Sequence, residues 1–77
     1  MKVTLFTKVE CGLCREAETM LQRLRQKLPL ELEVVDIEGD PALYNSYWDR
    51  VPVVVVEGRE VAAAPLDEAL LWKALST

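Results

Sequence analysis

The spacing of hydrophobic residues changes several times along the chain, and each change marks a structural element. Residues Lys2 to Phe6 are rich in β-forming side chains and predict a first strand that lies inside its sheet. From Gly12 onward the apolar positions recur at intervals of three and four, which predicts a helix that Pro29 stops. The apolar face of this helix consists of Leu13, Ala17, Met20, Leu21, Leu24 and Leu28.

The middle of the chain predicts a strand, a short helix and another strand. Residues 30–37 alternate between apolar and acidic side chains and then turn apolar, as a strand does. Asp40 suits the N-cap of a short helix and Pro41 suits its first position, and we expect this helix to end near Asp49. The unbroken run Val53–Val56 is typical of a strand covered on both faces.

The end of the chain predicts a hairpin and a last helix. A tight turn at Glu57-Gly58 leads to the strand Arg59–Ala63, whose charges suit an exposed edge. Pro65 is expected to open the last helix, with Asp67 and Glu68 in its first turn. The order βαβαββα places the chain in the α/β class. We expect a right-handed parallel β-α-β unit, a final hairpin, and helices on both faces of the sheet.

Length and charge limit the classes of function. With 77 residues the chain is expected to form one domain, residues 1–77. The net charge is −4 and basic residues alternate with acidic ones, so no nucleic-acid partner is expected. The longest apolar run, Val51–Val56, is far shorter than the roughly 20 residues that span a bilayer, so no membrane partner is expected either. The first residues lack the pattern of a signal peptide, and the expected location is the cytoplasm.

Two cysteines carry the candidate chemistry. Cys11 and Cys14 flank Gly12 and Leu13 where the first strand gives way to the first helix. Unpaired N–H groups and the helix dipole stabilise a thiolate at a helix N-terminus, so Cys11 is predicted to be the nucleophile. Cys14 lies about one turn further and is predicted to be the resolving thiol, while Gly12 allows a tight turn that keeps the Cys11 sulfur accessible. The pattern predicts a thiol–disulfide oxidoreductase that needs no prosthetic group.

Other interpretations of the cysteine pair stay open. The pair supplies two zinc ligands, and because the chain has no histidine and no further cysteine, zinc would need carboxylates or a bridged homodimer. For the single chain the prediction is therefore no metal. A purely structural disulfide with this short loop would contribute about 2 kcal/mol of stability. The same spacing can also be a coincidence in a non-catalytic binding module.

Four segments of the chain carry a family resemblance. They are Thr4-Leu5-Phe6-Thr7, Lys8-Val9-Glu10-Cys11-Gly12-Leu13-Cys14, Val34-Val35-Asp36-Ile37 and Arg50-Val51-Pro52-Val53. Together they resemble the glutaredoxin branch of the thioredoxin superfamily, and more closely the short glutaredoxin-like proteins of bacteria and archaea. The resemblance extends over nearly the whole chain. It implies a thioredoxin fold, with a four-stranded mixed sheet that has the first strand inside and is flanked by three helices.

The resemblance also implies roles for residues outside the cysteine pair. It implies a cis Val51–Pro52 bond facing the cysteines, with the backbone of Val51 pairing with a bound thiol substrate. Lys8 stands where glutaredoxins carry a lysine that binds a carboxylate of glutathione. With Gly12 and Leu13, these residues form the expected substrate-binding set. From the residues alone, Pro52 would be an ordinary trans proline and Lys8 an exposed loop charge.

Two departures from the glutaredoxin pattern bear on the reductant. Gly12-Leu13 replaces the usual Pro-Tyr between the cysteines, and residues 62–67 replace the glycine pair before the last helix. Glutathione and a reductase of the thioredoxin-reductase type are therefore both candidate reductants. The expected substrate is a disulfide in a protein or in a small molecule. We expect a monomer that serves electron transport and cell redox homeostasis.

Overall fold

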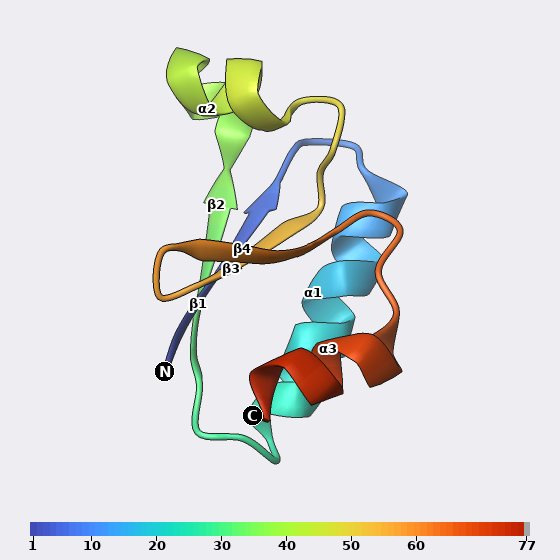
Figure 1. The fold of residues 1–77 in the computed structure, drawn as a ribbon. Helices are drawn as coiled ribbons and strands as arrows, with labels where there is room; N and C mark the ends of the chain where they lie inside the picture. Colours follow the sequence, from blue (N-terminus) through green and yellow to red (C-terminus); the bar gives the residue numbers. More distant parts are fainter. Residues whose placement is uncertain (77) are drawn as a thin grey trace.

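The computed structural model describes residues 1–76 and contains one mixed sheet with helices around it (Figure 1). Its elements are, in chain order, β1 (Lys2–Thr7), α1 (Gly12–Arg25), β2 (Glu31–Asp36), the 3₁₀-helix η1 (Ile37–Gly39), α2 (Pro41–Tyr47), β3 (Val53–Val56), β4 (Arg59–Ala63) and α3 (Glu68–Leu75). The predicted order βαβαββα is confirmed, and η1 is added between β2 and α2.

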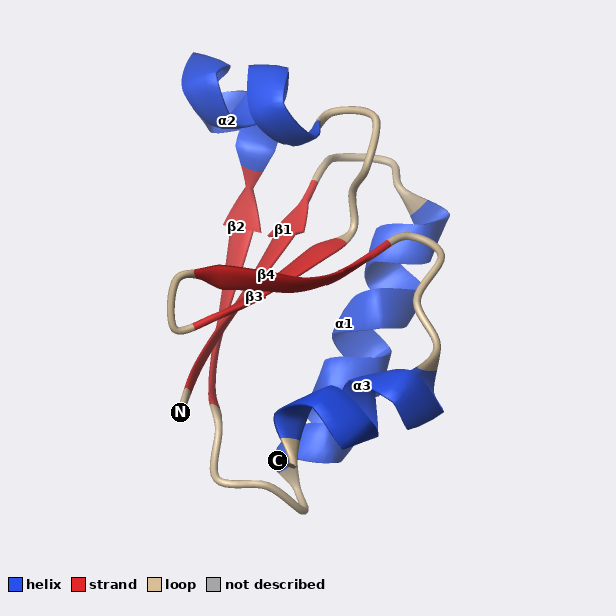
Figure 2. Ribbon diagram, in the orientation of Figure 1, coloured by secondary structure: helices blue, strands red, loops and turns tan. Residues whose placement is uncertain are grey.

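The sheet brings three connections to one edge. Its strand order is β2-β1-β3-β4, so β1 is inside the sheet as expected (Figure 2). β1 runs parallel to β2 and antiparallel to β3, and β3 and β4 form an antiparallel hairpin. The loop that follows β1, the helix η1 that follows β2 and the loop that precedes β3 therefore lie at the same edge. These segments carry Cys11, Glu38 and Pro52, and Cys14 follows in the first turn of α1.

α1 and α3 pack on one face of the sheet and form the main core with it (Figure 1). The apolar residues of α1 face the sheet because their spacing of three and four places them on one side of the helix. Complete burial of a leucine or valine side chain contributes about 1.5–3 kcal/mol to stability. The buried residues of this core are Val3, Leu5, Ala17, Leu21, Leu24, Leu30, Val54, Leu71 and Leu75.

An exposed ion pair joins the two helices at the end of α1 that lies far from the cysteines. The guanidinium of Arg23 donates two hydrogen bonds to the carboxylate of Glu68, the first residue of α3. These hydrogen bonds are the main reason why the pKa of Glu68 is lowered and the pKa of Arg23 is raised. Both side chains are open to solvent, so this pair contributes little to stability.

Helices lie on both faces of the sheet, as expected, but the second face is covered at one end only. α2 has seven residues and lies beyond the end of β2 (Figure 1). It reaches this face where the ring of Tyr47 stacks on Phe6, with centroids 4.6 Å apart. Val53, the cross-strand neighbour of Phe6, is fully buried, whereas Val55 further along β3 is half-buried. The short helix cannot cover the whole face.

The last helix begins later than predicted. Asp67 is the N-cap of α3, and its carboxylate accepts a hydrogen bond from the N–H of Leu70 at 3.1 Å. An aspartate in this position satisfies an otherwise unpaired N–H, so the helix starts directly after it. The prediction that Pro65 opens the helix is wrong, because Pro65 lies in the preceding loop, after a cis Ala64–Pro65 bond. Within the described residues, no helix combines the length and apolar character that a bilayer span requires.

Candidate active site

Cys11 caps the N-terminus of α1, as the sequence predicts. Its backbone is extended, and its sulfur accepts a hydrogen bond from the N–H of Cys14 at 3.2 Å. Its carbonyl accepts the first bond of the helix, from the N–H of Arg15 at 3.2 Å. The sulfur thus occupies the place where a capping serine or aspartate puts its oxygen. A backbone N–H that donates to this sulfur, at the positive end of the helix dipole, is the kind of setting in which thiolates are generally favoured.

Cys11 and Cys14 form a disulfide in which the two sulfurs differ in access. Their Cα atoms are 5.2 Å apart, within the usual range for a disulfide. Cys11 is partly exposed, whereas Cys14 is 3% exposed and packs against Ile37 and Val51. A reaction partner can therefore reach Cys11 and is kept from Cys14.

A small hollow of about 150 Å³ lies beside the two sulfurs. Its other lining residues are Thr7, Lys8, Glu10, Arg15 and Glu18, so two cations face two carboxylates. Pockets that enclose small-molecule ligands commonly measure roughly 300–1,000 Å³. The hollow therefore suits a disulfide presented at the surface of a partner better than an enclosed ligand.

Lys8 lies at this hollow and also links the loop after β1 to the end of α2. Its ammonium donates a hydrogen bond at 3.4 Å to the carbonyl of Trp48, the C-cap of α2. The negative end of a helix dipole favours a cation at this place. To the exposed loop charge that the residues alone predict, the structure adds a partner for one of the donors of Lys8.

Glu38 holds the loop before Cys11, and the sequence did not single it out. Its carboxylate accepts a hydrogen bond from the N–H of Val9 at 2.7 Å. The next residue, Glu10, has a φ of 56°, a conformation that is uncommon outside glycine. Glu38 is itself positioned by Asp36, which accepts from the N–H of Glu38 at 2.9 Å. The loop before Cys11, which has an unusual backbone at Glu10, is thus held by a hydrogen bond to Glu38 in η1.

The Val51–Pro52 bond is cis, as the resemblance implies. Pro52 is buried, and Val51 packs in one apolar cluster with Cys14 and Ile37. The N–H of Val51 already donates to the carbonyl of Tyr47 at 3.1 Å. Within residues 1–76, the carbonyl of Val51 accepts no hydrogen bond. Of the two backbone groups of Val51, the carbonyl is therefore the one available to a substrate.

Gly12 and Leu13, between the cysteines, are both exposed, and Leu13 is 53% exposed. Gly12 is the first residue of α1 and does not adopt a positive φ. A Cβ atom added there would meet no heavy atom within 4 Å. The special backbone freedom of glycine is therefore not used at Gly12, because ordinary helical backbone follows Cys11 directly.

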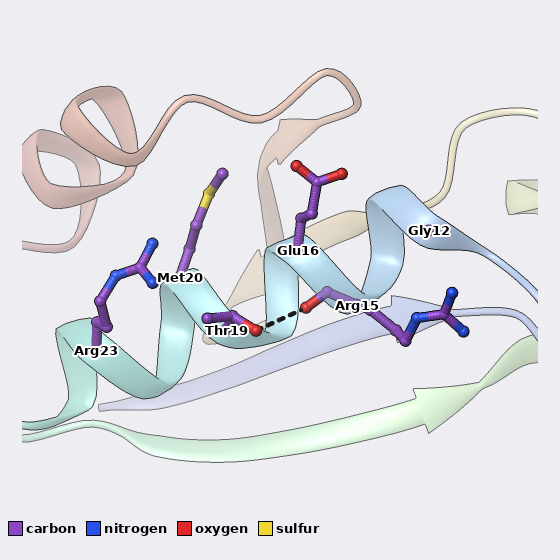
Figure 3. A pocket seen from close by; sticks show the side chains of 6 residues that line it. All are labelled: Gly12, Arg15, Glu16, Thr19, Met20 and Arg23. Carbon is purple, nitrogen blue, oxygen red and sulfur yellow. Dashed lines mark hydrogen bonds between the residues drawn. The ribbon is translucent and has the colours of Figure 1, made fainter.

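A wider hollow on the outer face of α1 starts at Gly12 but includes neither sulfur (Figure 3). It measures about 490 Å³ and is lined by Gly12, Arg15, Glu16, Thr19, Met20 and Arg23. Figure 3 shows the side chains of Arg15 and Glu16 pointing to different sides of the helix, and the hydroxyl of Thr19 donating to the carbonyl of Arg15 at 3.0 Å. Since one helix supplies every lining residue, the hollow beside the sulfurs is the better candidate site.

The described residues contain no group of three or more histidine, cysteine, aspartate or glutamate side chains that could hold a metal ion. A zinc site built on Cys11 and Cys14 would thus draw its remaining ligands from a second copy of the chain.

Known proteins match the chain in sequence and in fold. An uncharacterized protein of Mycobacterium tuberculosis, Rv0508, is 31% identical, with 87% of this chain and 74% of that protein covered. An X-ray structure of a structural-genomics target from X. campestris matches with a TM-score of 0.82 and 33% identity, covering 96% of this chain and 95% of that one. A thioredoxin from Halobacterium salinarum matches with a TM-score of 0.75 and 24% identity, covering 97% of this chain and 71% of that one.

The match to the thioredoxin shows the fold of this chain, and a family model shows the family to which it belongs. The α/β thioredoxin fold, with its four-stranded mixed sheet and three helices, is the fold that the resemblance implied. The family model matches residues 2–76. The chain therefore belongs to the family described as the glutaredoxin-like domain (DUF836).

Proposed function

We propose that this protein is a dithiol oxidoreductase that reduces disulfides through Cys11 and Cys14. One observation carries the proposal: the accessible sulfur caps a helix N-terminus, while its disulfide partner is 3% exposed. A purely structural disulfide has no need for this asymmetry. A disulfide-exchange reaction does need this asymmetry. The first thiolate must be accessible to the substrate, and the second thiol must react only after the mixed disulfide has formed.

The proposed reaction starts from the reduced protein. The Cys11 thiolate attacks one sulfur of a substrate disulfide, forms a mixed disulfide with it, and releases the other substrate sulfur as a thiolate that takes up a proton. Cys14 loses its proton and attacks the Cys11 sulfur of the mixed disulfide. The second substrate sulfur leaves as a thiolate, and the protein keeps the Cys11–Cys14 disulfide. Two electrons have then passed from the protein to the substrate.

The substrate is proposed to lie between the sulfurs, Leu13 and the loop before β3. A substrate backbone N–H would donate to the free carbonyl of Val51, and the buried Pro52 would hold that carbonyl in place. The hollow lined by Lys8 and Arg15 offers positive charge to an acidic group of the substrate.

The dithiol would be regenerated either by two molecules of glutathione, which leave as one glutathione disulfide, or by a reductase of the thioredoxin-reductase type. Both reductants belong to the cytoplasm, where we place the protein as a monomer that serves electron transport and redox homeostasis.

The test is the reduction of a model mixed disulfide, with glutathione as donor and separately with a thioredoxin reductase. Wild type, Cys11→Ser and Cys14→Ser are compared. Cys11→Ser should be inactive with either donor. Cys14→Ser should accumulate the mixed disulfide when no glutathione is present, because nothing resolves it. Turnover by Cys11→Ser equal to wild type would overturn the assignment of the nucleophile.

Metal analysis and solution mass of the reduced protein complete the test. Zinc at about half an equivalent per chain in a dimer would instead favour the bridged homodimer.

A further inference from the structure

Arg50 stands immediately before the Val51–Pro52 bond, and its guanidinium is held from two sides. One nitrogen donates to the carboxylate of Glu60 on β4 at 2.7 Å. Another donates to the carbonyl of Ser46 in α2 at 3.4 Å. This side chain therefore connects the edge strand of the sheet to α2, directly next to the carbonyl that we propose for substrate binding.

The ring of Tyr47 extends this set of contacts to the central strand. The guanidinium of Arg50 lies over that ring, 5.1 Å from its centroid. On β1, Phe6 stacks against the same ring, with the two planes 14° apart. Phe6, Tyr47, Arg50 and Glu60 thus form a chain of contacts, which we call the Arg50 clamp, from β1 to β4.

The backbone of Arg50 is fixed as well. Its N–H donates to the carbonyl of Tyr47 at 2.9 Å, and its carbonyl accepts from the N–H of Ala64 at 3.4 Å. The next N–H, that of Val51, also donates to the carbonyl of Tyr47. Arg50 and Val51 are joined by a peptide bond, and both of their N–H groups donate to the same carbonyl. A movement of Arg50 would therefore also move the carbonyl of Val51.

Stability alone does not account for the Arg50 clamp. The side chains of Arg50 and Glu60 are 41% and 38% exposed, and exposed ion pairs contribute little to stability. Lysine could supply the charge. A planar guanidinium is needed to lie on an aromatic ring while donating to two acceptors in different directions.

We propose that Arg50 is a positioning residue that orients the Val51 carbonyl toward the backbone of a polypeptide substrate. The inference rests on the proposed function and adds the substrate class: a disulfide whose cysteine is part of a peptide, with a backbone N–H to donate. Arg50 itself touches no reacting atom. Its effect should therefore depend on whether the substrate has a backbone.

The test compares two disulfides. The first is an oxidised peptide, and the second is bis(2-hydroxyethyl) disulfide, which has no backbone N–H. The second-order rate constant for oxidation of the reduced protein is measured for each. Arg50→Ala should lower the rate constant for the peptide roughly three- to tenfold, the range expected for one misplaced hydrogen bond. The rate constant for bis(2-hydroxyethyl) disulfide should stay unchanged, because this substrate has no backbone N–H and the attack of Cys11 on its sulfur does not depend on the Val51 carbonyl.

Further variants keep the test sharp if Arg50→Ala folds poorly. Arg50→Lys keeps the charge without the planar contacts and should show part of the loss with the peptide. The matched control is Arg59→Ala, which removes an exposed cation from β4, outside the Arg50 clamp, and it should affect neither substrate.

An equal loss with both disulfides, or no loss with the peptide in Arg50→Ala and Arg50→Lys, would overturn the inference while the proposed function stands. Absence of turnover by the wild type with either disulfide would overturn the proposed function and the inference together.

Discussion

At the scale of single residues, the same side chain serves two roles because its surroundings differ. Cys11 ends a loop, accepts a helix N–H and reaches the surface, whereas Cys14 lies inside the first turn against Ile37. A spacing of three is what allows both: it closes a disulfide and also puts the second sulfur on the inner face of the helix. The asymmetry between the two thiols is therefore local and is set by the start of α1.

Gly12 offers a test of what this turn requires. Gly12→Ala should stabilise the protein by about 0.5–1 kcal/mol, because helical alanine loses less backbone entropy on folding and its Cβ meets open space. Urea unfolding measures the change. Gly58→Ala is the matched control: Gly58 has a φ of 82°, so a Cβ there is strained and should cost about 1 kcal/mol. A loss of stability in Gly12→Ala would contradict our description of the turn.

At the scale of elements, η1 is small but is hydrogen-bonded to the loop before Cys11, in which Glu10 has a positive φ. Ile37 is fully buried under the disulfide, and its neighbour Glu38 bonds the loop through Val9. Ile37 thus fixes the position of η1 by its burial, and Glu38, the next residue, holds the loop before Cys11 by its hydrogen bond.

Replacing Glu38 should loosen this loop. Glu38→Ala removes the acceptor of the Val9 N–H and should cost about 1 kcal/mol, the usual net worth of one hydrogen bond. Hydrogen exchange of the Val9 amide should become faster. Glu38→Gln keeps an acceptor oxygen at the same reach and should retain most of the protection. Equal protection of Val9 in wild type and Glu38→Ala would show that the loop is held by other contacts.

The elements also show what the sequence could predict. The position of Cys11 at the start of α1 was predictable, because the strand, the loop and the helix are neighbours in the chain. The start of α3 was not, since Pro65 and Asp67 both signal a helix start and the cap at Asp67 decides it. Val9 bonds Glu38 across 29 residues and Lys8 bonds Trp48 across 40, and no local pattern predicts such pairs.

At the scale of the whole molecule, the core and the candidate site occupy different parts of the fold. The main core lies between the sheet and the pair α1 and α3, whereas a smaller cluster surrounds Cys14, Ile37 and Val51 at the edge. The parallel pair β1–β2 brings their following segments to that edge, and antiparallel β3 adds the proline loop. Strand order therefore assembles the site, while α3 contributes to stability from the other end of α1.

Two adjacent leucines of α3 test this separation. Leu71 is 1% exposed in the main core, and Leu70 is 66% exposed. Leu71→Ala should cost about 2–5 kcal/mol, a large share of the 5–15 kcal/mol typical of small domains, because a cavity remains. Leu70→Ala should change stability by less than about 0.5 kcal/mol.

Below the unfolding transition, the reduced forms of both variants should keep the wild-type rate of Cys11 alkylation by iodoacetamide, because the smaller cluster around Cys14 includes no residue of α3. A slower alkylation in folded Leu71→Ala would mean that packing at α3 reaches the start of α1. The core and the site could then no longer be treated as separate parts of the fold.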